Sequence, residues 1–200
     1  MRDVDEDAIV GAVRAAEART SGQIVCVLAQ RSSEINGETT ILAAALALLT
    51  PWPLLAFTQI PAQHIFAIQV AVFAAALLLF TITHLGLALT PRFLKRRQAF
   101  RVAAEQFYIR GMTRTRHRAG VLIFVSLAEH YARIIADDGL TGKITESEWQ
   151  DTVNELTSHL RAHQVTEGFL DAIKRTGDLL ARSAPPDGGS NDLPDRLVRI

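Results

Sequence analysis

Two adjacent carboxylates, Asp137 and Asp138, directly follow an apolar run of the chain, and Glu129 with His130 precedes the same run. Calcium binds about six to eight oxygen atoms of carboxylates and carbonyls, and a loop that contains Asp and Gly supplies several of them. The spacing makes Glu129, Asp137 and Asp138 candidate metal ligands, with calcium as the ion that fits. The alternative, which we favour, is a solvated turn in which the Asp side chains bond their own backbone.

The other chemistry-bearing residues form no recognisable catalytic motif. His159 and His163 are spaced i, i+4 on an expected helix, but no HExxH arrangement supports zinc, and we favour an exposed surface for both. Cys26 lies within an apolar run, where burial raises the pKa of a thiol and lowers its reactivity. We recognise no catalytic Ser or Cys and no phosphate-binding glycine loop. The sequence therefore predicts no cofactor.

The N-terminal segment of the chain, residues 1–38, is predicted to contain a helix followed by a strand. Ile9, Val13 and Ala16 recur on one face at helical spacing. Residues 23–30 are β-branched and apolar on both faces, which is typical of a central strand in a sheet covered on both sides. One strand forms no sheet alone, so its partners must come from later in the chain.

The later segment supplies these partners and more helices. Residues 120–127 and 131–136 are predicted strands, and the three residues between them allow only an antiparallel hairpin. Thr145 and Glu148 have the spacing of a capping box that opens a helix. A further helix is expected over residues 164–182. Before these strands, within residues 92–118, Phe93, Phe100 and Phe107 recur every seven residues and predict an amphipathic helix. Leu94, Ala103 and Ala104 are expected beside them on the same face.

A charge-free block separates the two segments. From Thr39 to Pro91 there is no Asp, Glu, Lys or Arg, so the chain's zero net charge is a sum over unlike parts. A bilayer core needs roughly 20 apolar residues of helix, and the block has room for two such spans, at residues 41–60 and 65–89. Pro51 and Pro53 predict a kink or an early end in the first span. Residues 61–64 make the turn between them, and two buried helices of a soluble core are the less favoured alternative.

The charges next to this block predict its orientation. Residues 92–118 carry 9 basic and 1 acidic side chains, a net charge of +8. Positive residues close to a span remain in the cytoplasm, so both termini are placed there and the protein in the inner membrane. We favour a membrane-surface role over nucleic-acid binding, because the rest of the cytoplasmic part is acidic. The expected membrane-surface residues are Arg92, Lys95, Arg96, Arg97 and Arg101.

The run from Val121 to Leu140, VLIFVSLAEHYARIIADDGL, followed by a helix with Trp149, resembles the TPM domain family, named after a thylakoid lumen protein, a photosystem repair protein and a nematode receptor modulator. The segment from Glu17 to Val25 resembles the opening of the same domain. The resemblance covers about residues 5–38 and 115–182. It is strongest to bacterial membrane members, in which a two-span hairpin interrupts the domain after its first strand.

This resemblance implies an α/β/α sandwich with a mixed central sheet. Some members are acid phosphatases or calcium binders, and others assemble or repair membrane complexes. Where the family often has Asp-Asn-Gly, this chain has Arg118-Ala119-Gly120, and Gln23 stands where many relatives have Glu. Each departure removes a ligand from the strand-end cleft, which disfavours metal-dependent phosphatase chemistry.

The sequence thus predicts an α/β protein with a transmembrane helical hairpin, whose cytoplasmic TPM-like domain is a non-catalytic interaction or assembly module. The alternative is a weak metal-dependent phosphatase that uses Asp137 and Asp138. Expected partners are the lipid bilayer and another membrane protein or complex. The sequence leaves open whether the chain also forms a homo-oligomer, and nucleic acid is not expected as a partner. The layout is a split domain at 1–38 and 119–182, a hairpin at 39–91, a basic helix at 92–118 and a flexible tail at 183–200 that docks its last apolar residues.

Overall fold

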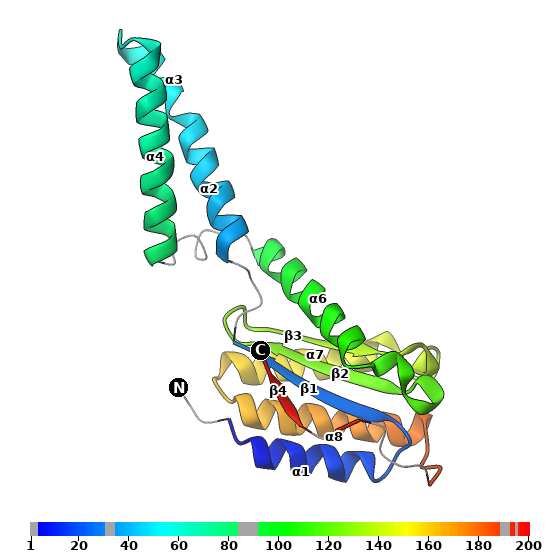
Figure 1. Cartoon of the computed structure of the whole chain (residues 1–200). Coiled ribbons are helices and arrows are strands. Elements are labelled where there is room, and N and C mark those ends of the chain that lie inside the picture. Colours follow the sequence, from blue (N-terminus) through cyan, green and yellow to red (C-terminus); the bar gives the residue numbers. More distant parts are fainter. Residues whose placement is uncertain (1–3, 31–34, 84–91, 189–192, 195) are drawn as a thin grey trace. The chain divides into compact units, whose positions relative to one another are not determined.

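A computed structural model describes residues 4–30, 35–83, 92–188, 193–194 and 196–200 (Figure 1). The chain divides into two compact units. One consists of Met1–Ser32 together with Arg96–Ile200, and the other of Ser33–Lys95. The first unit is therefore assembled from two stretches of sequence that the second unit separates.

A four-stranded mixed sheet forms the centre of the first unit. Its strands are β1 (Gln23–Ala29), β2 (Gly120–Ser126), β3 (Tyr131–Ala136) and β4 (Leu197–Arg199), in the order β3-β2-β1-β4. β1 is parallel to β2 and to β4, and β2 is antiparallel to β3. Every residue of β1 and β2 is buried, because both strands are central and both faces are covered. The mixed sheet and the antiparallel hairpin are confirmed.

Helices cover the two faces of the sheet and complete an α/β/α sandwich, as Figure 1 shows. On one face lie α1 (Glu6–Glu17), α7 (Glu146–Arg161) and α8 (Val165–Ser183), which pack on Cys26 and Ile123 of the central strands. On the other face lies α6 (Arg92–Ile109). The expected capping box is present: the Thr145 side chain accepts from the backbone N–H of Glu148, and the Glu148 carboxylate accepts from that of Thr145.

The buried face of α6 differs from the predicted one. Ala99, Ala103 and Phe107 face the sheet at i, i+4, i+8 spacing, whereas Phe100 is 44% exposed and lies under the guanidinium of Arg133, 4.9 Å from the ring centre. At about 100° per residue, Ala99, Ala103 and Phe107 span about 80° of the helix circumference, and Phe100 lies just outside this buried arc. The side chains of Phe93 and Leu94 lie outside the described residues. The helix ends at Ile109, and two 3₁₀ turns, Met112–Arg114 and Arg116–Arg118, replace the rest of the expected helix.

The last residues of the chain form a short strand. α8 ends at Ser183, and Leu197–Arg199 adds β4 to the edge of the sheet beside β1. Leu197 and Val198 are buried, as expected of a docked end, while Ile200 stays exposed. Ile200 extends the pairing because its N–H donates to the carbonyl of Leu28, 3.1 Å away. The periodicity did not reveal β4, because three residues are too few to show an alternation.

The second unit is a helical hairpin made of α2 (Ile35–Leu49), α3 (Pro51–Phe57) and α4 (Ala62–Thr83). The break at Thr50 agrees with the predicted effect of the prolines, and the helix already ends at Phe57. Thr58–Pro61 forms the turn, so Ala62–His64, predicted to be the turn, belong to α4. Residues 84–89 of the predicted second span lie outside the described residues.

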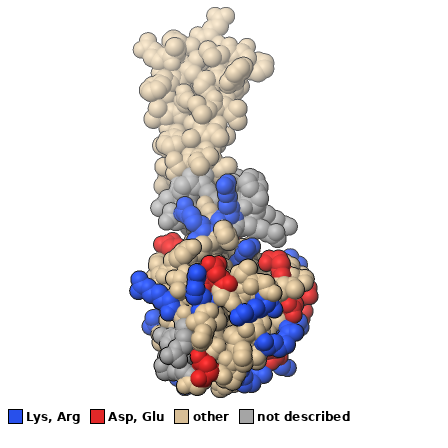
Figure 2. Space-filling model, turned by 90° about the vertical axis from the view of Figure 1, so that its right-hand side faces the viewer, with Lys and Arg blue, Asp and Glu red and all other residues tan. Residues whose placement is uncertain are grey.

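The apolar side chains of the hairpin are largely exposed. Two segments, Thr40–Phe57 and Ala62–Ile82, are long and apolar enough to cross a membrane, and only 11% of each is buried. Trp52, Phe57 and Phe66 are among the most exposed. Figure 2 shows Lys, Arg, Asp and Glu over the α/β unit, whereas the tan surface of the helical hairpin that is visible there has none. Ala43, Ala47 and Ala76 are buried, so small residues let α2 and α4 pack together.

Candidate functional site

Asp137 and Asp138 lie at the carboxyl end of the edge strand β3. The N–H of Asp137 donates to the carbonyl of Gly120 over 2.9 Å, which continues the β2–β3 pairing by one residue. The Asp137 side chain is only 3% exposed, whereas that of Asp138 is 78% exposed. Asp137 Oδ1 accepts from the N–H of Asp138 over 2.8 Å and so caps the 3₁₀ turn Asp138–Leu140. The two carboxylates are thus adjacent, but one is buried and the other faces solvent.

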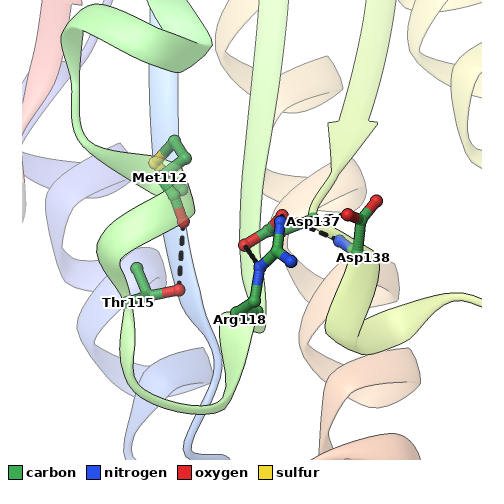
Figure 3. Close-up of polar contacts among 5 residues, drawn as sticks. All are labelled: Met112, Thr115, Arg118, Asp137 and Asp138. Atoms are coloured by element: carbon green, nitrogen blue, oxygen red, sulfur yellow. Dashed lines mark hydrogen bonds and ion pairs between the residues drawn. The ribbon is translucent and has the colours of Figure 1, made fainter.

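The cation between these carboxylates is an arginine of the chain itself (Figure 3). Arg118 donates to Asp137 through Nε over 3.3 Å and through Nη2 over 3.1 Å, and Nη2 also lies 3.0 Å from Asp138 Oδ2. The planar guanidinium matches a carboxylate with two parallel donors. The hydrogen bond to Asp137 is the main reason why the pKa of Arg118 is raised, followed by the negative charges of Asp137 and Asp138.

The backbone before β2 positions Arg118. The Thr115 hydroxyl donates to the carbonyl of Met112 over 3.1 Å, and the N–H of Arg118 donates to the carbonyl of Thr115 over 3.0 Å. His117 and Arg118 then adopt positive φ angles of 62° and 51°, a left-handed conformation that side chains rarely take. This pair of residues turns the chain so that Arg118 points toward Asp137.

Gly139 allows this loop to approach the 3₁₀ turn after β3. A Cβ at Gly139 would lie 2.1 Å from the carbonyl oxygen of His117 and 2.5 Å from that of Arg118. No side chain fits at that distance, so a glycine is required where the two backbones meet. The Arg118–Asp138 contact therefore depends on a glycine that the sequence showed only as part of a turn.

Glu129 and His130 do not join this group. They lie in the turn at the opposite end of the β2–β3 hairpin, where Ser126 pairs with Tyr131, while the aspartates follow the pair Val121–Ala136. At a rise of about 3.3 Å per residue, the two ends of the hairpin are about 17 Å apart. The Glu129 carboxylate accepts a hydrogen bond from the Ser126 hydroxyl. The prediction that Glu129 and the two aspartates form one compact group is wrong, because it overlooked the length of the strand between them.

A groove of about 560 Å³ runs past the aspartates, between α6 and the carboxyl end of β3. Its walls include Phe100, Tyr108, Arg133 and Trp149, together with Arg118, Asp137 and Asp138. In this groove the two carboxylates already have a guanidinium as counter-ion. The arrangement therefore forms a structural ion pair at the edge of an accessible surface.

The other residues singled out in the sequence serve structural contacts. Gln23 is buried, and its Oε1 accepts from the N–H of Leu193 over 3.1 Å, which holds the segment before β4. Cys26 is fully buried, and the pKa of its thiol is raised well above its usual range, mainly by burial and secondly by the charge of Glu17. His163 follows the end of α7 with a φ of 60°, so it does not share a helical face with His159.

The predicted membrane-surface residues lie on the first half of α6. Arg97 and Arg101 are exposed there. The side chains of Arg92, Lys95 and Arg96 lie outside the described residues. Sequence reasoning noted Arg118 only as a departure from a family pattern and missed its role as the partner of both aspartates. The sequence did contain one signal for this role: Arg118 directly precedes β2, and in an antiparallel hairpin the start of β2 lies beside the end of β3, where the aspartates follow.

Comparison with known proteins agrees with this architecture. A model of the TPM domain matches residues 81–179. The NMR structure of the BA42 protein from the psychrophilic bacterium Bizionia argentinensis is similar with a TM-score of 0.62 and 20% sequence identity, over 100% of both chains, a likeness that shows the fold alone. No curated protein matches the chain. With its split α/β/α sandwich and the matched residues, the chain belongs to the TPM domain family.

Proposed function

We propose that this chain is an inner-membrane protein whose TPM domain lies in the cytoplasm and acts as a non-catalytic module for interaction with, or assembly of, another membrane protein or complex. The observation that carries the proposal is the Arg118 guanidinium held between Asp137 and Asp138. A phosphatase of the metal-dependent kind needs carboxylates that are free to hold a divalent cation. Here a fixed cation of the chain contacts both of them and offsets one of their two negative charges.

The exposed hairpin supports the membrane part of the proposal. A soluble core helix would be mostly buried, whereas long apolar side chains such as Trp52, Leu48 and Leu78 are exposed over both candidate spans. A bilayer is the partner that covers such a surface at the lowest cost. The net charge of +8 on residues 92–118 favours the cytoplasm for the chain that follows α4.

A phosphatase assay tests the non-catalytic role. Full-length protein in detergent micelles should not hydrolyse p-nitrophenyl phosphate above background in Ca²⁺ or Mg²⁺, and millimolar Ca²⁺ should not shift its melting temperature. Hydrolysis by the wild type that Asp137→Ala with Asp138→Ala abolishes would overturn the proposal in favour of the phosphatase alternative.

A variant designed to gain Ca²⁺ binding provides a positive result for the melting-temperature measurement. Arg118→Asp with Ala119→Asn introduces the Asp-Asn-Gly sequence found in many family members and removes the internal cation. We expect this double variant to acquire Ca²⁺-dependent thermal stabilisation that the wild type lacks, since three carboxylates would then share one end of the sheet. Arg114→Asp is the matched control, because it adds the same charge in the preceding 3₁₀ turn, where Arg114 is exposed. Equal stabilisation of the wild type and the double variant would show that Arg118 does not exclude the ion.

A further inference from the structure

Three metal-ligating side chains meet on the α7–α8 hairpin, away from the Arg118–Asp137 pair. Glu155 and His159 are one turn apart on α7, and Asp171 comes from α8. One ligand atom of each residue lies within 4.8 Å of the other two. The side chains are 48%, 26% and 33% exposed, so an ion has access from solvent. An imidazole with two carboxylates from two rigid helices is a donor set that suits a borderline divalent metal.

The close approach of the two helices creates this meeting. Gly168 of α8 faces His159, and a Cβ at Gly168 would lie 2.9 Å from the His159 Cβ. Only the residues 162–164 connect α7 to α8, so the helices run antiparallel. Moving one turn forward along α8 from Gly168 therefore moves back along α7 from His159 toward Glu155. Asp171 occupies that position.

The imidazole of His159 is already oriented for binding through Nε2. Its Nδ1 lies 3.2 Å from the side-chain oxygen of Gln164, which accepts a hydrogen bond from the Nδ1–H tautomer. Nε2 then carries the lone pair, and it lies 3.8 Å from Glu155 Oε1, beyond hydrogen-bonding distance. Metal-binding histidines commonly donate their second ring N–H to a carbonyl in this way, which fixes the tautomer and the plane of the ring.

We propose that Glu155, His159 and Asp171 form a zinc-binding site with three protein ligands. Tetrahedral zinc places ligand atoms about 3.4 Å apart, given bonds of about 2.1 Å, so half-exposed carboxylates need only a small rotation to close on the ion. Arg175 competes for one of them, because its Nε lies 2.7 Å from Asp171 Oδ2. That contact is an exposed i, i+4 ion pair, which contributes little stability and leaves the second carboxylate oxygen available.

Titration of full-length protein in detergent micelles tests the site. Calorimetry with ZnCl₂ should show one ion per chain, and CoCl₂ should give a visible ligand-field absorption band. Removal of the imidazole in His159→Ala should abolish the band, and Gln164→Ala should weaken zinc binding about tenfold through the loss of the orienting bond. Arg175→Gln should strengthen it, because the competing cation is gone.

His163→Ala is the matched control, since it removes an imidazole four residues away that lies outside the site. It should bind zinc as the wild type does. Metal-free melting curves, together with the milder Glu155→Gln, separate loss of a ligand from loss of the fold. Absence of binding to the wild type at millimolar zinc, or equal binding by His159→Ala, would overturn the proposal. Neither result bears on the non-catalytic role, which depends on Asp137 and Asp138.

Discussion

At the scale of single residues, burial decides what Asp137, Cys26 and Gln23 do. Each carries a functional group of a kind that can take part in catalysis or metal binding, and each is at most a few per cent exposed. Asp137 has an arginine partner, Gln23 accepts from a backbone N–H, and the Cys26 thiol has its pKa raised by burial. The sequence correctly predicted that the thiol is buried. It did not predict the arginine, because pairing between residues 118 and 137 depends on left-handed backbone at His117 and Arg118, which no local pattern indicates.

Removal of Arg118 should destabilise the protein more than removal of a comparable exposed arginine. Arg118→Ala leaves the buried Asp137 carboxylate without its charged donors, and an unpaired buried charge is costly. We expect a clear fall in melting temperature, with partial recovery in Arg118→Lys, whose ammonium supplies charge without the bidentate geometry. Thermal unfolding of the full chain measures this. Arg114→Ala is the control, and an equal fall in both variants would contradict a special role for Arg118.

At the scale of elements, the predictions that held rest on patterns several residues long. The seven-residue strands β1 and β2, the hairpin to β3 and the capped helix α7 each carry repeated local signals. The predictions that failed concern short or geometric features. β4 has three residues, and the buried face of α6 follows a spacing of four rather than seven. The separation of Glu129 from Asp137 is likewise set by the length of β3. The two residues are close in sequence, but the extended strand between them places them at opposite ends of the β2–β3 hairpin.

The start of α7 should make the protein sensitive to acid. The pKa of Glu148 is lowered, first by the backbone hydrogen bond from Thr145, then by the Thr145 hydroxyl and by Arg182. A carboxyl with a lowered pKa in the folded state stabilises the fold above its unfolded pKa of about 4.3, and this contribution is lost as pH falls through the folded pKa. Melting temperatures of Glu148→Gln should therefore show less dependence on pH below about 4.3 than those of the wild type.

The control for this experiment is Glu146→Gln, the same substitution in the same first turn. Glu146 carries a similar charge near the helix N-terminus but takes no part in the capping box. Its pH dependence should stay close to that of the wild type. If Glu148→Gln and Glu146→Gln behave alike, the effect arises from the helix dipole alone and the cap contributes nothing specific to it.

At the scale of the whole molecule, one sheet joins the sequence segments that precede and follow the α2–α4 helical hairpin. β1 precedes α2 and α4 in the chain, whereas its neighbours β2 and β4 follow them, and each of the two pairs with β1 in parallel. A hairpin with two spans returns the chain to the side from which it left. The pairing of β1 with β2 requires this return, so the proposed membrane topology must have an even number of crossings. A single crossing by α2 or α4 would divide the sheet across the bilayer.

The charge distribution then predicts which side carries the domain, and reporter fusions test it. A reporter that is active only in the cytoplasm should be active at Ile200, and one that is active only in the periplasm should be active when inserted in the turn between Phe57 and Ala62. Exchanging Arg97 and Arg101 for Gln removes exposed positive charge beside the second span and should raise the fraction of inverted molecules. Because β1 and β2 must remain on one side, inversion should move both termini together. Activity of the periplasmic reporter at Ile200 in the wild type would reverse the orientation while leaving the paired sheet intact.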